Sequence, residues 1–130
     1  MIFLTTRPPS AGETTQRQSQ RWLEAHGFPL PSVFVVQTSR GRIAHALGLD
    51  AVVDDSLENC LDVAAESHAK AILVGHGDPE AVPAAARRRG VRAVASAGEA
   101  IDLLETLHDL QVDERVAGSL KRLLRLARKG

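Results

Sequence analysis

The sequence predicts an α/β fold, specifically a three-layer, doubly wound domain with a five-stranded parallel sheet. Short apolar runs rich in Val and Ile alternate with helical segments along the 130 residues, which is the order of a parallel sheet covered by helices. The runs are continuously apolar rather than alternating, as expected of strands buried on both faces. The simplest doubly wound strand order for such a chain is 2-1-3-4-5.

Turn and capping residues set the bounds of each element. Five strands are predicted, namely Ile2–Thr5, Val33–Val36, Ala51–Asp54, Ala71–Gly75 and Arg92–Ala95. Six helices are predicted. The first four run from the capping box Ser10-Ala11-Gly12-Glu13 to Gly27, from Ser39 to Gly48, from Ser56 to about Ser67, and from Asp78-Pro79 to Gly90. The fifth covers Ile101–Leu110 after a second capping box at Ser96-Ala97-Gly98-Glu99, and the sixth runs from about Val112 to Arg128. We therefore expect an α/β domain over residues 1–110, followed by a C-terminal helix over 111–130.

The predicted C-terminal helix is amphipathic and basic. Its apolar residues fall at helical spacing, namely Val112, Val116, Leu120, Leu123, Leu124 and Ala127. Residues 115–130 carry six basic side chains and no acid. We expect this helix to pack on the domain with a solvated basic face. One alternative is a helix that pairs with a second copy of the chain or with another partner, and the remaining one is a helix that binds a membrane surface or a nucleic acid.

Composition excludes several classes of protein. No apolar run reaches the roughly 18 residues that a membrane span needs, and the N-terminus has no signal-type core. A single cysteine, Cys60, excludes an internal disulfide and favours a cytoplasmic protein. Aromatic residues make up only 3% of the chain, which argues against a base-stacking nucleic-acid surface.

Polar residues follow two of the predicted strands. Thr5, Thr6 and Arg7 end the first strand, and Asp54 and Asp55 end the third. In the order 2-1-3-4-5 these strands pair directly, so both ends lie at the topological switch point, where open α/β sheets bind ligands. A plain loop at the first strand end is the alternative. At the second, the alternative is acids that only cap the following helix.

An ordered series of segments adds a resemblance to this picture. The series is Thr5-Thr6-Arg7-Pro8, Trp22-Leu23-Glu24-Ala25-His26-Gly27-Phe28-Pro29, Gly41-Arg42-Ile43-Ala44, Gly48-Leu49-Asp50 and Asp54-Asp55-Ser56-Leu57-Glu58-Asn59. Over roughly residues 2–75 it resembles the haloacid dehalogenase-like (HAD) phosphohydrolases, in the branch that includes the cytosolic deoxyribonucleotidases. The resemblance implies that Thr5, with Thr6 and Arg7, binds phosphate. It implies that Arg40 stands nearest the phosphate-neutralising lysine, and that Asp54 and Asp55 hold Mg²⁺.

One motif of that family has no counterpart here. The aspartate nucleophile belongs on a strand before the one ending at Thr5, and Ile2–Thr5 follows Met1 directly. We therefore expect a non-catalytic or incomplete HAD-like domain that binds phosphate or a nucleotide, and Mg²⁺, weakly. One alternative is a phosphatase or nucleotidase whose nucleophile motif lies outside this chain. Another is an interaction module that uses the C-terminal helix.

Overall fold

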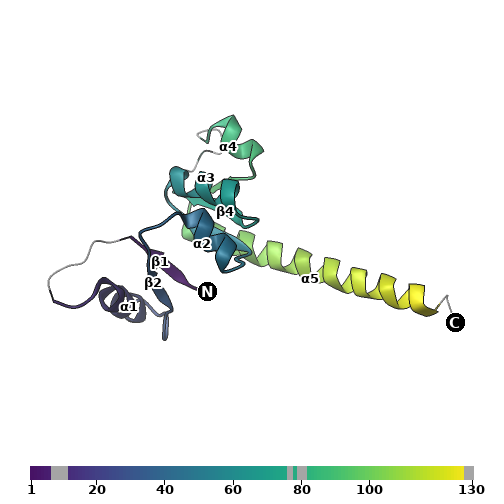
Figure 1. Cartoon of the computed structure of the whole chain (residues 1–130), viewed down its shortest axis with the longest axis horizontal. Coiled ribbons are helices and arrows are strands. Elements are labelled where there is room, and N and C mark those ends of the chain that lie inside the picture. The colour runs from purple at the N-terminus through teal and green to yellow at the C-terminus, as the bar shows by residue number, and fades with distance from the viewer. Residues whose placement is uncertain (7–11, 76–77, 79–81, 128–130) are drawn as a thin grey trace. The chain divides into compact units, whose positions relative to one another are not determined.

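The computed structural model (Figure 1) describes residues 1–6, 12–75, 78 and 82–127, with side-chain surroundings given as far as residue 119. Contacts divide the chain into two compact units, Met1–Thr38 and Ser39–Gly130. Strands and helices alternate in both units, and every strand pair is parallel, which confirms the α/β class.

The first unit consists of β1 (Phe3–Thr5), α1 (Thr15–Ala25) and β2 (Val33–Val35). β1 and β2 pair in parallel. Helix α1 begins later than predicted, because its N-cap is Thr14, whose hydroxyl accepts a hydrogen bond from the Arg17 N–H at 3.4 Å. The predicted cap residue Ser10 lies outside the described residues. The helix ends just before Gly27, as predicted, and the φ of +91° at Gly27 is one that glycine adopts without strain.

The second unit carries the remaining elements. They are α2 (Arg40–Ala46), β3 (Ala51–Asp54), α3 (Leu57–Glu66), β4 (Lys70–Val74), α4 (Ala84–Arg88), β5 (Arg92–Val94) and α5 (Ala97–Ala127). The sheet order is β3-β4-β5, so β4 is central. Ile72 and Leu73 on β4 are almost completely buried, together with Val63 of α3 and Val82. The core of this unit therefore lies around β4 and α3.

The predicted five-stranded sheet is wrong. The described strands form two sheets, β1-β2 and β3-β4-β5, and the predicted pairing of Ile2–Thr5 with Ala51–Asp54 is not among the strand pairs. Within each sheet, the neighbouring strands β2-β1 and β3-β4-β5 agree with the predicted strand order. The prediction assumed strands buried on both faces, but Phe34 and Val35 of β2 and Val53 of β3 are exposed. A continuous apolar run thus did not mean a central strand here.

The C-terminal region also differs from the prediction. Instead of two helices separated near residue 111, α5 is one helix of 31 residues. No Gly or Pro lies between Leu110 and Val112, and Gln111 is a good helix former, so nothing interrupts the helix there. Across the part of the chain that the structure describes, no helix is both long and apolar enough to cross a membrane.

Candidate functional site

The predicted site residues fall in different units. Thr5 ends β1, where its carbonyl accepts a hydrogen bond from the Val36 N–H at 2.8 Å, and Thr6 follows it. Arg7 lies outside the described residues. Arg40, Asp54 and Asp55 belong to the second unit. The site that the structure allows us to build from contacts is therefore the one around Arg40 and Asp54.

Local hydrogen bonding fixes Asp54 at the end of β3. One of its carboxylate oxygens, Oδ1, accepts a hydrogen bond from the Ser56 N–H at 2.8 Å. The Asn59 side-chain amide lies 3.1 Å from both carboxylate oxygens. Ser56 caps α3 as predicted, because its hydroxyl accepts a hydrogen bond from the Asn59 N–H at 3.3 Å. Asp54 thus stabilises the turn from β3 into α3 as well as facing the site.

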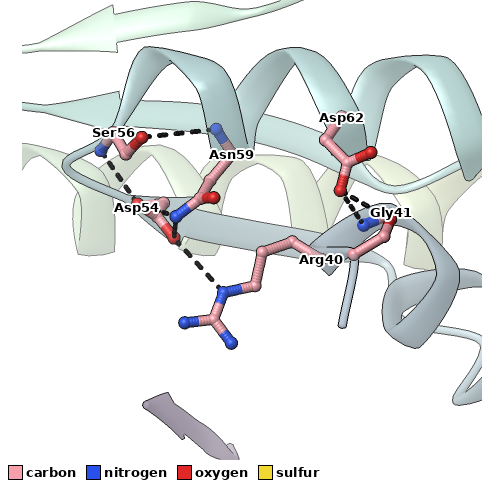
Figure 2. A network of polar contacts seen from close by, with 7 residues as sticks. Arg40, Gly41, Asp54, Ser56, Asn59 and Asp62 are labelled. Carbon is pink, nitrogen blue, oxygen red and sulfur yellow. Dashed lines mark hydrogen bonds and ion pairs between the residues drawn. The ribbon is translucent and has the colours of Figure 1, made fainter. Parts of the chain in front are cut away.

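Arg40 reaches this carboxylate from the start of α2. Its Nε lies 3.9 Å from Oδ2 of Asp54, which is an ion pair but too long for a hydrogen bond. Arg40 is only 7% exposed, and its Nη1 is a buried nitrogen without a hydrogen-bond partner. Figure 2 shows Nε toward Asp54 and the two terminal nitrogens directed away from the carboxylate. The charge of the guanidinium is balanced, while at least one of its donor groups is not satisfied.

The N-terminus of α2 is held by a carboxylate of α3. Asp62 Oδ2 accepts hydrogen bonds from the Ser39 hydroxyl at 2.6 Å and from the Gly41 N–H at 2.9 Å, as Figure 2 shows for Gly41. The Gly41 N–H contributes most to holding the pKa of Asp62 below its usual range, followed by the Ser39 hydroxyl. The Asp62 carboxylate therefore occupies the N-terminus of α2, where the helix dipole favours a negative charge.

Gly41 makes this contact between α2 and α3 possible. A Cβ at this position would overlap the Asp62 carbonyl group and would lie 2.8 Å from Cβ of Glu66. The two helices therefore approach each other at a point where only glycine fits. The sequence carried a signal for this contact in Asp62 and Glu66, which are four residues apart on one helix, but the prediction of the site did not rest on it.

Cys60 lies on α3 and is completely buried, so it contributes to the core. Burial raises the pKa of its thiol to about 12, and the nearby charges of Asp54 and Asp55 add to that effect. A thiol of this kind stays protonated at neutral pH and is a poor nucleophile.

The arrangement fits Mg²⁺ poorly. Both oxygens of Asp54 face N–H donors, and the Arg40 guanidinium stands where a cation would be repelled. Asp55 is exposed, and no group of three or more His, Cys, Asp or Glu side chains able to hold a metal occurs among the described residues. Mg²⁺ also needs oxygen ligands in near-octahedral geometry. Asp54 would have to give up its present partners to bind the ion.

Two pockets lie away from this site. In the second unit, a pocket of about 340 Å³ lies where β3 and β4 begin, and its lining includes Asp50 and Lys70. In the first unit, a pocket of about 500 Å³ lies between α1 and β2 and is lined by Gln16, Gln20 and Glu24. Neither contains a predicted site residue. Gln16, Gln20 and Glu24 are spaced four residues apart and so lie on one face of α1. This spacing is the feature of the sequence that could have indicated the pocket in the first unit.

Comparison of the chain with protein-family models, with curated proteins and with solved structures finds no match. The site therefore has to be interpreted from its own geometry.

Proposed function

We propose that the second unit is a non-catalytic α/β module that binds a phosphate-type oxyanion weakly at Arg40. The observation that supports this most is the buried Nη1 of Arg40, which has no hydrogen-bond partner. Leaving such a donor unpaired costs about 1–3 kcal/mol, and more for a charged group. A phosphate oxygen accepting from the guanidinium would remove that cost, and the planar guanidinium suits a tetrahedral oxyanion.

The neighbouring charges limit the affinity. Asp54 already balances Arg40, so an incoming dianion gains attraction from the guanidinium and meets repulsion from the carboxylate. A hydrogen bond to a charged group contributes roughly 1.5–3 kcal/mol net. Two such bonds, reduced by the repulsion, correspond to a dissociation constant of roughly 1 mM. The proposed ligand is a small phosphate-containing molecule, in keeping with the resemblance to HAD phosphohydrolases.

Mg²⁺ binding is part of the same proposal, also as a weak interaction. Asp54 and Asp55 are the carboxylates that would hold the ion. Because Asp54 must first leave Asn59 and Ser56, we expect a dissociation constant no better than roughly millimolar, which is the weak end of carboxylate sites. Titration with Mn²⁺, followed by paramagnetic broadening of amide signals, measures this directly. Broadening that survives replacement of both acids by Asn would place the ion elsewhere.

The anion site is tested by titrating the full chain with inorganic phosphate and with adenosine monophosphate, followed by amide chemical shifts. We expect saturable shifts around Arg40 in the wild type and their loss in Arg40→Gln. Arg40→Lys, which keeps the charge without the planar fork, should bind several-fold more weakly. Arg42→Gln is the matched control, because Arg42 lies on the same helix with its side chain 78% exposed and paired with Glu66.

A variant at Asp54 separates anion binding from metal-dependent binding. In Asp54→Asn the negative charge next to the guanidinium is gone, so phosphate should bind more tightly without Mg²⁺. Loss of phosphate binding in this variant, or shifts unchanged by Arg40→Gln, would contradict the proposal. Turnover of an aryl phosphate on the order of 1 per second, abolished by Asp54→Asn, would support a hydrolase instead.

A further inference from the structure

A pocket of the second unit lies at the amino ends of β3 and β4, whereas Asp54 ends β3 at its other side. The volume of the pocket is about 340 Å³, which falls within the range of small-molecule sites. Five polar side chains line it, and they come from α2, from the segments that lead into β3 and β4, from β4 itself and from α5. They are His45, Asp50, His68, Lys70 and Gln111. The pocket is therefore separate from the anion site proposed at Arg40.

Asp50 and Lys70 bring opposite charges to this pocket. The Lys70 N–H donates a hydrogen bond to the Asp50 carbonyl at 3.0 Å, so the two side chains start from neighbouring points of the sheet. Among the residues whose side chains the structure describes, none of the five polar side chains of the pocket makes a hydrogen bond or an ion pair. The carboxylate and the ammonium group are thus close in the fold and both available to a ligand.

Gln111 is the part of the pocket that comes from α5. From residue 108 to residue 119 every residue of this helix except Gln111 is exposed. Its amide offers hydrogen-bond donors and an acceptor, so it can bind either a carboxylate or an ammonium group. Ala44 and Leu49 line the pocket beside the polar groups, and both pack in the core of the unit. They provide an apolar surface that suits a short aliphatic side chain.

We infer that this pocket binds a small zwitterion, namely a free α-amino acid with a short aliphatic side chain. The ligand carboxylate accepts from the Lys70 ammonium group, and the ligand ammonium group donates to the Asp50 carboxylate. A ligand with only one of these charges is attracted by one residue and repelled by the other. A metal ion fits less well, because no group of three or more His, Cys, Asp or Glu side chains able to hold one occurs in the described part of the chain.

Titration of the full chain with L-valine, followed by amide chemical shifts, tests this inference. We expect saturable shifts around Leu49 and Lys70 with a dissociation constant on the order of 1 mM, because two charge-assisted hydrogen bonds in an open pocket contribute modestly. Isovalerate and isobutylamine are the matched controls, since each keeps the aliphatic side chain and only one of the two charges. Each should bind at least about tenfold more weakly. Absence of shifts at roughly 50 mM L-valine, or equal binding of isovalerate, overturns the inference.

Two variants test which residue binds which group of the ligand. Asp50→Asn and Lys70→Gln should each weaken L-valine binding roughly tenfold. Asp50→Asn should at the same time strengthen isovalerate binding, because the repelling carboxylate is gone, and a merely structural effect would not reverse the preference in this way. Both residues are exposed, so the variants should keep the wild-type shifts of β4 and β5.

Matched controls for these variants remove an exposed charge outside the pocket. Asp102→Asn on α5 and Arg88→Gln on α4 serve this purpose, and both should bind L-valine as the wild type does. L-valine binding that is unchanged in Asp50→Asn or in Lys70→Gln refutes the assignment. Binding that falls equally in the control variants refutes it as well, because the effect would then come from the overall charge of the chain.

Discussion

Replacing Gly41 by alanine should destabilise the second unit, although alanine is the better helix former. In an exposed helix interior the change from Gly to Ala stabilises by up to about 1 kcal/mol. At Gly41 the new methyl group would overlap the Asp62 carbonyl group and lie 2.8 Å from Cβ of Glu66, so α2 and α3 must separate. Overpacking of this kind costs about 1–3 kcal/mol. Separation also weakens the hydrogen bonds that Asp62 accepts, each contributing about 1–2 kcal/mol.

The net expectation is a loss of about 2–4 kcal/mol in the free energy of unfolding of the second unit. The assay has to report on that unit, and the single tryptophan, Trp22, lies in the first. Hydrogen exchange of the α2 and α3 amides in increasing urea gives the required local measurement. Faster exchange of α2 and α3 is expected, and α1 should exchange as in the wild type.

Gly118→Ala is the control for propensity alone. Gly118 lies in α5, and a Cβ there would meet nothing within 4 Å. This variant should raise the stability of α5 by about 0.5–1 kcal/mol. If Gly41→Ala stabilised the protein by a similar amount, the close approach of α2 and α3 described above would be incorrect.

Two further predictions concern α3. Asp62→Asn should lower stability by about 1 kcal/mol at pH 7, because the amide replaces a charged acceptor at the α2 N-terminus. The pKa of Asp62 is lowered in the folded state, so its contribution is present above the unfolded value of about 3.9 and is lost as pH falls through the folded pKa. The urea midpoints of the two proteins should therefore converge as the pH falls below about 3.8, and a constant gap would exclude this origin. Cys60, with its pKa raised to about 12, should resist a thiol-reactive disulfide reagent in the native protein and react in denaturant. Rapid native labelling at pH 8 would show that the thiol is accessible.

Capping residues located three helix starts correctly, whereas α1 begins at Thr15 rather than after Ser10, and α4 begins at Ala84 rather than after Asp78-Pro79. Ser39 and Ser56 cap their helices as expected, and Ser96 accepts from the Glu99 N–H at 3.2 Å at the start of α5. These signals work because a hydroxyl and a backbone N–H three residues later are always within reach. Capping chemistry says nothing about which strands share a sheet. The neighbours within each small sheet were predicted correctly, and their union into one sheet was not.

The sequence named Arg40 and Asp54 as candidate site residues but did not predict their contacts. Arg40 and Asp54 were assigned to phosphate and metal separately, whereas they form an ion pair with each other. The roles of Asn59 and Asp62 depend on side chains meeting across turns and between helices, which spacing along the chain does not specify. Burial of the Arg40 guanidinium is likewise a property of packing, and Arg40 and Arg42 differ in burial although both are arginines two residues apart.

The order of strands in the second unit has a consequence for how this unit forms. Because β3, β4 and β5 are neighbours in the sheet in the same order as along the chain, each pairing joins strands that are consecutive in the sequence. Mixed α/β folds lie between helical bundles and all-β folds in folding rate, because each parallel pairing still closes a crossover of about 20 residues. During synthesis, α3 can bring β4 onto β3 before β5 and α5 have left the ribosome. Each new strand then pairs with a sheet edge that has already formed, so no apolar strand of this unit depends on a partner from a distant part of the sequence.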